Sequence, residues 1–126
     1  MLVDYLKFIL LILFFIFYIW IFIILKMKRS NLALLKRIKE GAIILDIRST
    51  KEYNKAHYVK AVNIPFNNLF AKKGKLGSID NQIIIYGRSF NKCFEAEKIL
   101  RGVGFKNIFV AGTLKNMPKL QEEGNG

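Results

Sequence analysis

The hydrophobic and polar positions of the chain divide it into two unlike parts. Residues 8–25 (FILLILFFIFYIWIFIIL) contain no charged residue, no glycine and no proline. As a helix, these 18 residues rise about 27 Å, close to the roughly 30 Å thickness of a bilayer's hydrocarbon core. We therefore predict an N-terminal anchor at residues 1–29, with a membrane-spanning helix over about residues 6–25.

A cleaved signal peptide and a buried core helix are the alternative interpretations of this run. A signal peptide has a shorter apolar run and a small-residue cleavage site, whereas Lys26-Met27-Lys28-Arg29 follows the run here. A helix that is apolar on every face needs a far larger protein around it to be buried. The anchor is the interpretation that we retain.

Beyond the anchor, short apolar runs alternate with segments of helical spacing. Four short runs are almost entirely apolar, the pattern of strands buried on both faces: 42–46, 61–64, 82–86 and 107–110. Helices are expected at 32–40 after a cap at Ser30 or Asn31, after Ser49 or Thr50, from near Cys93, and at 114–120. This alternation predicts one α/β domain with a mainly parallel sheet, over residues 30–120.

Two polar segments of the domain are expected to lack regular structure. Residues 72–77 (KKGKLG) are predicted to form a flexible surface loop. Residues 121–126 (QEEGNG) are predicted to form a flexible tail.

Basic residues predict the orientation of the anchor. Only Lys7 and the terminal amine lie on its N-terminal side, whereas residues 26–37 carry five basic residues. The positive-inside bias then places the domain in the cytosol and a very short N-terminus outside. We expect a single-pass protein of the cell (inner) membrane.

The charge of the chain bears on its partners. Lys and Arg number 21 and Asp and Glu 9, for a net charge of +12. The lysines are scattered rather than concentrated on one element, and no nucleic-acid-binding signature is present, so we expect no nucleic-acid partner. The expected partner is the lipid bilayer, whose anionic leaflet attracts each nearby Lys or Arg by about 1 kcal/mol.

Cysteine usage and nucleotide motifs exclude several classes of site. The single cysteine, Cys93, excludes a disulfide framework and a cysteine-based zinc site within one chain. No GxxxxGK[ST] motif is present, and no G-x-G-x-x-G follows a strand, so nucleotide binding is not indicated. We expect neither a metal nor a cofactor.

The segment after the strand at 82–86 is the expected site. In open α/β sheets, ligands bind at the carboxyl ends of strands, where loops lead into helix N-termini. A six-residue loop is predicted here, formed by Gly87, Arg88, Ser89, Phe90, Asn91 and Lys92. Its glycine, its basic side chains and the following helix N-terminus favour a small anion, or an acidic or membrane protein partner.

Several separated motifs resemble one family. Residues 45–53 (LDIRSTKEY) and 57–65 (HYVKAVNIP) are similar to the D-x-R…E-[FY]…H-I-x-G-A-x-N-I-P pattern of the rhodanese homology domain, and residues 104–112 (GFKNIFVAG) continue the likeness. The resemblance covers about residues 30–119 and implies a rhodanese-like fold. With its anchor, the chain also resembles bacterial single-domain rhodaneses that carry one N-terminal membrane helix.

The resemblance implies sulfur transfer, but one position departs from the family. The family carries a persulfide on a cysteine at the first loop position, which is Gly87 here. We therefore expect a binding or regulatory module at the cytosolic membrane face, without standard thiosulfate sulfurtransferase activity. The alternative is a sulfurtransferase or thiol-redox enzyme that uses Cys93 as a displaced thiol, activated by nearby positive charge. Against this stands a packing role for Cys93 in the first helical turn.

Four polar residues of the matching motifs are expected to be structural. Asp46 and Arg48 are two residues apart, a spacing that places both on one face of a strand. In the family such residues belong to the framework of the domain. With Glu52 they are predicted to form a polar cluster. His57, the only histidine, has the residue type of a general base, but its place before a strand in the family pattern indicates a structural role.

Overall fold

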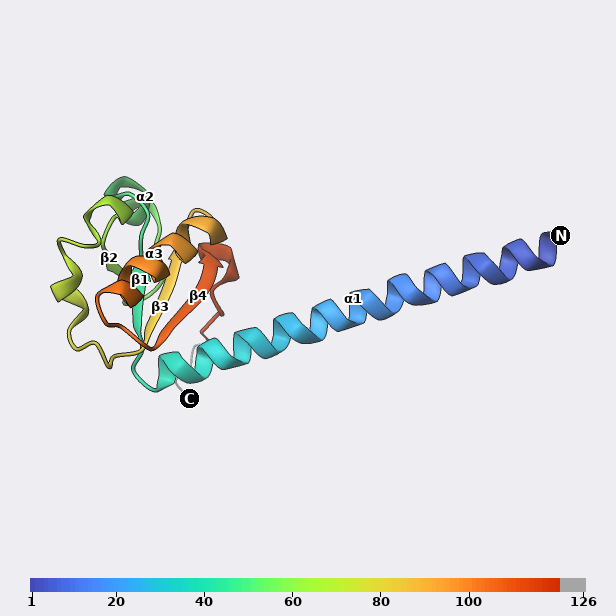
Figure 1. Cartoon of the computed structure of the whole chain (residues 1–126), viewed down its shortest axis with the longest axis horizontal. Helices are drawn as coiled ribbons and strands as arrows, with labels where there is room; N and C mark the ends of the chain where they lie inside the picture. Colours follow the sequence, from blue (N-terminus) through green and yellow to red (C-terminus); the bar gives the residue numbers. More distant parts are fainter. Residues whose placement is uncertain (121–126) are drawn as a thin grey trace, which may run out of the picture. The chain divides into compact units, whose positions relative to one another are not determined.

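The N-terminal part of the chain is one long helix. In the computed structural model, which describes residues 1–120, helix α1 extends over Leu2–Lys39 (Figure 1). The side chains of residues 8–25 are all exposed, and the described part of the chain buries none of them. By length and composition, α1 is able to cross a membrane.

The bounds of α1 correct two expectations. A membrane helix over about residues 6–25 and a separate helix over 32–40 were expected, but α1 is continuous through both. Ser30 and Asn31 lie inside the helix instead of capping it. No glycine or proline interrupts the sequence between Leu25 and Lys39, so nothing in the chain stops the helix there.

The chain divides into two units, Met1–Leu32 and the residues from Ala33 onward. The second unit contains a four-stranded sheet in which all pairings are parallel. Its strand order is β2-β1-β3-β4, with β1 at Ile43–Asp46, β2 at Val62–Asn63, β3 at Ile83–Gly87 and β4 at Ile108–Thr113. The predicted α/β domain with a parallel sheet is thereby confirmed, and the carboxyl ends of all strands lie at one edge.

Both faces of the sheet are buried, as the continuous apolar runs predict. Because successive side chains of a strand alternate, Ile83 and Ile85 of β3 contact one core cluster, whereas Ile84 and Tyr86 contact another. The first cluster includes helix α3 (Phe90–Gly102), and the second includes Leu34 from the last turns of α1. The remaining helical elements are α2 (Thr50–Lys55) and the 3-10 turns η1 (Phe66–Asn68), η2 (Lys73–Leu76) and η3 (Leu114–Asn116).

Two segments differ from the expected elements. The loop predicted at 72–77 contains η2, because Leu76 is fully buried in the core and fixes the segment. The helix predicted at 114–120 is only the turn η3, since Pro118 disfavours helical backbone at the residue before it. The tail predicted at 121–126 lies outside the described residues.

Lys60 adopts backbone angles that favour glycine. Its φ is 61°, and it is the one non-glycine residue among residues 1–120 with a positive φ. In this region the Cβ crowds the following carbonyl oxygen, which costs about 1–2 kcal/mol. The turn before β2 is therefore strained at this residue.

Lys60→Gly is expected to raise the free energy of unfolding by about 0.5–1 kcal/mol, because glycine removes the Cβ strain at some cost in chain entropy. Urea unfolding of the full chain in detergent micelles measures the change. Lys60→Ala keeps the Cβ and serves as the matched control, for which no such gain is expected. Equal stabilisation by both substitutions would contradict the strain.

Candidate functional site

A cleft of about 350 Å³ lies at the carboxyl edge of the sheet. Its lining comes from the segments that follow β1, β2 and β3: Ile47, Arg48, Ser49, Pro65, Phe66, Asn67, Arg88 and Lys92. Three of these side chains are basic and none is acidic, so the cleft favours an anion. An adjacent hollow of about 420 Å³ shares Arg48 and Arg88 with it.

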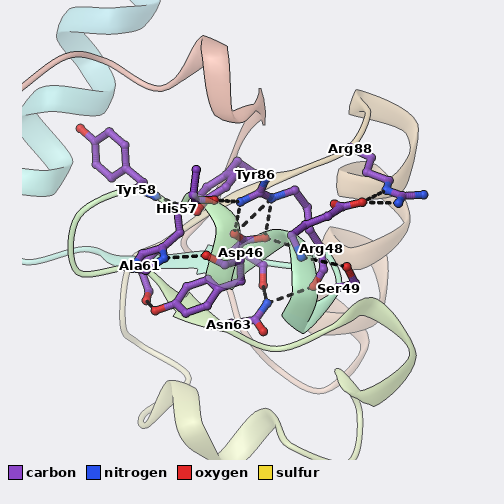
Figure 2. Close-up of polar contacts among 12 residues, drawn as sticks. Asp46, Arg48, Ser49, His57, Tyr58, Ala61, Asn63, Tyr86 and Arg88 are labelled. Carbon is purple, nitrogen blue, oxygen red and sulfur yellow. Dashed lines mark hydrogen bonds and ion pairs between the residues drawn. The ribbon is translucent and has the colours of Figure 1, made fainter.

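A buried ion pair lies at the end of β1 (Figure 2). Asp46 is fully buried, and its Oδ1 accepts hydrogen bonds from the backbone N–H of Arg48 at 2.8 Å and from its Nε at 3.1 Å. Its Oδ2 accepts from Arg48 Nη2 at 2.8 Å, and this two-point contact raises the pKa of the guanidinium. Because Arg48 is paired with Asp46, the Asp46 carboxylate largely neutralises the positive charge that Arg48 brings to the cleft.

A second ion pair is exposed. Arg88, the residue after β3, donates from Nε to Glu52 Oε1 at 2.6 Å, and its Nη2 donates to the same oxygen (Figure 2). The hydrogen bond from Arg88 is the main cause that lowers the pKa of Glu52. The Arg88 side chain is 74% exposed, and exposed pairs contribute little net stability. An anion in the cleft can therefore compete with Glu52 for Arg88.

The connection between β3 and α3 is shorter than expected. A six-residue loop with a helix from near Cys93 was predicted, but β3 ends at Gly87 and α3 begins at Phe90. Ser89 is the N-cap, and its Oγ accepts a hydrogen bond from the N–H of Lys92 at 3.3 Å. Serine is a favoured N-cap residue, a signal that was present in the sequence. Phe90, Asn91 and Lys92 thus belong to the first helical turn.

Lys92 is the second exposed cation of the cleft. Its Nζ lies 4.3 Å from the centroid of the Phe66 ring, which also lines the cleft. The same Nζ lies 3.3 Å from Glu95 Oε2, one turn along the helix. Lys92 is thereby held at the cleft wall by weak contacts, which leaves its charge available to a ligand.

Gly87 has no room for a side chain. A Cβ at this position would lie 2.8 Å from Ile47 Cγ1 and 3.3 Å from Cys93 Sγ. Ile47 and Cys93 both belong to the buried core. The position that follows the β3 run is therefore closed by packing, and any side chain there would have to displace Ile47.

Cys93 lies in the interior of the domain. The residue is fully buried, and its Sγ–H donates to the carbonyl of Gly112 at 3.3 Å. Burial raises the pKa of the thiol to about 11. These contacts are those of a packing residue, and the displaced-thiol hypothesis requires a local opening that would expose Sγ.

Phe90 covers the backbone of β4 next to this thiol. Gly112 has a φ of 105°, and a Cβ on it would lie 2.4 Å from the Phe90 ring. Gly112 thus leaves space that the ring occupies. Phe90 and Cys93, three residues apart on α3, both contact Gly112.

The predicted polar cluster does not form one network. Asp46 and Arg48 bind each other, but Glu52 pairs instead with the residue after β3. His57 is exposed, its Nδ1 lies 2.7 Å from the carbonyl oxygen of Tyr53, and its ring stacks on the Tyr53 ring with centroids 3.8 Å apart. Among residues 1–120, His57 is not one of the residues that line the cleft.

Two residues that support the site were missed. Asn63 Nδ2 donates to the carbonyls of Asp46 and Arg48, at 3.1 and 3.0 Å. The Tyr86 hydroxyl accepts from the N–H of Tyr58 at 3.0 Å (Figure 2), and burial raises its pKa. The role of Asn63 could have been predicted, because a polar residue within an apolar strand needs hydrogen-bond partners. Tyrosine is common in strands, so Tyr86 carried none.

Comparisons with known proteins agree on one fold. The family model of the rhodanese-like domain matches residues 30–112. A rhodanese-like domain from Anabaena is 26% identical, with a TM-score of 0.53 over 56% of this chain and 80% of that one. A rhodanese with anions from E. coli is 24% identical, with a TM-score of 0.58 over 64% and 98% of the two chains. A human single-domain sulfurtransferase is 20% identical, with a TM-score of 0.55 over 70% and 86%.

One curated relative is similar in sequence. An uncharacterized protein of Buchnera aphidicola subsp. Schizaphis graminum is 38% identical over 58 residues, which are 43% of this chain and 40% of the relative. The match thus spans about two fifths of the relative's length.

The Cys93 thiol is expected to react with iodoacetamide at neutral pH at least about a hundredfold more slowly in the folded chain than in denaturant, because it is buried and protonated. Its pKa rises from 9.0 to about 11 on folding. The stability from this shift is therefore fully present below about pH 9 and is lost as the pH rises toward 11. Alkylation rates and unfolding midpoints in detergent micelles measure both effects.

Cys93→Ala is the control for the pH effect, and its stability should decline less between these pH values. Rapid alkylation of the folded chain at neutral pH would contradict the packing role.

Proposed function

The chain belongs to the rhodanese-like domain family, whose model matches residues 30–112, and on that basis we propose that it is a membrane-anchored module that binds an anionic group instead of transferring sulfur from thiosulfate. The family includes sulfurtransferases and regulatory single-domain members. The observation that carries the proposal is the closed position of Gly87, where a Cβ would meet Ile47 at 2.8 Å. The chemistry at the carboxyl edge of the sheet therefore decides between a sulfurtransferase and a regulatory member of the family.

Sulfur transfer through a persulfide needs an accessible thiolate, because the thiolate is the nucleophile. Gly87 supplies no sulfur. The one thiol of the chain, on Cys93, is buried and has a raised pKa. The alternative of a sulfurtransferase or thiol-redox enzyme that uses Cys93 is disfavoured for the same reason.

The cleft supplies binding chemistry instead. Arg88 and Lys92 extend exposed cationic groups along it, and the charge of Arg48 is held by Asp46. An acidic segment of a protein partner and a small anion share the chemistry that these cations recognise. Glu52 pairs with Arg88 in the free molecule, so a bound anionic group would replace the Glu52 carboxylate on Arg88.

The membrane anchor in this proposal is α1. Its run of exposed apolar side chains at residues 8–25 is able to cross a bilayer. The basic residues that follow the run support a cytosolic domain in the cell (inner) membrane, with the N-terminus outside. The module would then act at the cytosolic membrane face.

Full-length protein in detergent micelles, given thiosulfate and cyanide, is expected to form thiocyanate no faster than micelles alone. Cys93→Ser should show the same background rate, since neither protein presents a thiolate. A rate above background that Cys93→Ser abolishes would overturn the proposal. A reference sulfurtransferase in the same micelles verifies the assay.

Binding of sulfate, the probe for an anionic group, is expected to weaken about fivefold in Arg88→Gln and in Lys92→Gln, the loss of one charge-assisted contact each. Glu52→Gln should strengthen binding, because it frees Arg88 from its ion pair. Lys98→Gln, an exposed cation of α3 outside the cleft lining, is the matched control. Isothermal titration measures the affinities, and equal effects at Lys92 and Lys98 would contradict the site.

A further inference from the structure

Residues 70–75 (FAKKGK), here called the basic-aromatic loop, place an exposed ring among lysines. The Phe70 side chain is 63% exposed, although Leu69 before it is fully buried. Leu76, directly after the loop, is also fully buried. Both ends of the loop are therefore fixed in the core, and Phe70 is presented outward between them.

Backbone hydrogen bonds order the loop, one to the preceding turn and one within the loop. The N–H of Lys72 donates to the carbonyl of Asn68 at 2.9 Å, and the N–H of Lys75 donates to the carbonyl of Lys72 at 3.0 Å. The turn η2 then leads to Leu76. An ordered loop loses less conformational entropy when it meets a surface than a flexible loop would.

The charge around Phe70 has one sign. Lys72, Lys73 and Lys75 form no ion pair within residues 1–120. No acidic residue occurs in the sequence between Glu52 and Asp80. Lys73 Nζ lies 4.0 Å from the centroid of the Phe70 ring, so the cation and the ring present one combined surface.

A second exposed phenylalanine shows that exposure alone is not the distinguishing feature. Phe94 on α3 is 53% exposed, but Glu95 and Glu97 lie beside it in the sequence. Those two glutamates pair with Lys92 and Arg101, and Lys98 lies beside them, so the charges there are mixed. Phe70 and Phe94 are thus similar in exposure, but only Phe70 is surrounded by unpaired charge of one sign.

We propose that the basic-aromatic loop docks on the anionic headgroups of the bilayer that holds the chain. Lysines attract anionic lipid, an aromatic ring partitions into the headgroup region, and lysine stems extend so that their ammonium groups reach phosphates. The inference rests on the anchor in the proposed function, since a tether keeps the bilayer at high effective concentration. Docking makes the domain a peripheral membrane element as well as a tethered one.

The test uses the full chain in nanodiscs of phosphatidylcholine, with or without about a third of phosphatidylglycerol. Trp20→Phe removes the one native tryptophan, and Phe70→Trp then reports the loop. Bromine-labelled acyl chains, labelled near the headgroups, quench a tryptophan that reaches the bilayer. Phe94→Trp in the same background is the matched control.

The Phe70→Trp protein is expected to show blue-shifted emission and bromine quenching only in discs with phosphatidylglycerol. Lys72→Gln, Lys73→Gln and Lys75→Gln should each lower the docked-to-undocked ratio about fivefold, and 1 M salt should abolish docking. Phe94→Trp should respond to neither lipid nor salt.

Two failures are distinguishable. A chain that co-elutes with the discs but shows no quenching at position 70, or equal quenching at position 94, overturns the docking alone. A chain that does not co-elute with the discs overturns the anchor, and the docking with it.

Discussion

The two-point contact between Asp46 and Arg48 is the interaction on which the carboxyl edge of the sheet depends. A buried carboxylate is costly unless charge and hydrogen bonds compensate it, and Arg48 supplies both. The same guanidinium binds the carbonyl of Ala56 after α2, and Asn63 of β2 binds the carbonyls of Asp46 and Arg48. One charge pair thus joins β1, β2 and α2, and it sets the positions from which the cleft is built.

Packing closes the other half of this edge. Gly87, Ile47 and Cys93 fill a space in which a side chain at position 87 has no place. Phe90 covers Gly112 beside them. The exposed residues that line the cleft are two cations, Arg88 and Lys92, and two neutral polar residues, Ser49 and Asn67.

Sequence patterns predicted the sheet well because burial on both faces leaves continuous apolar runs, such as 82–86 in β3. Helix ends were harder. The end of the anchor helix was misplaced because Ser30 and Asn31 are capping residue types, yet without a glycine or proline they remain inside α1. At the site, the sequence predicted which cations, Arg88 and Lys92, lie near the cleft, but not which residues they pair with. That Glu52 binds Arg88 and not Arg48 depends on how α2 packs, which no local pattern encodes.

The ring of Phe90 and the backbone of Gly112 constrain each other, and this bears on which residues positions 87 and 112 can accept. Gly112 tolerates no side chain while the ring is present, and position 87 accepts none while Ile47 keeps its rotamer. A cysteine introduced at 87 would therefore meet an occupied interior, and relief at Ile47 would have to accompany it. A thiol at position 87 would therefore depend on how far the Ile47 side chain can move, and not on the backbone of the loop.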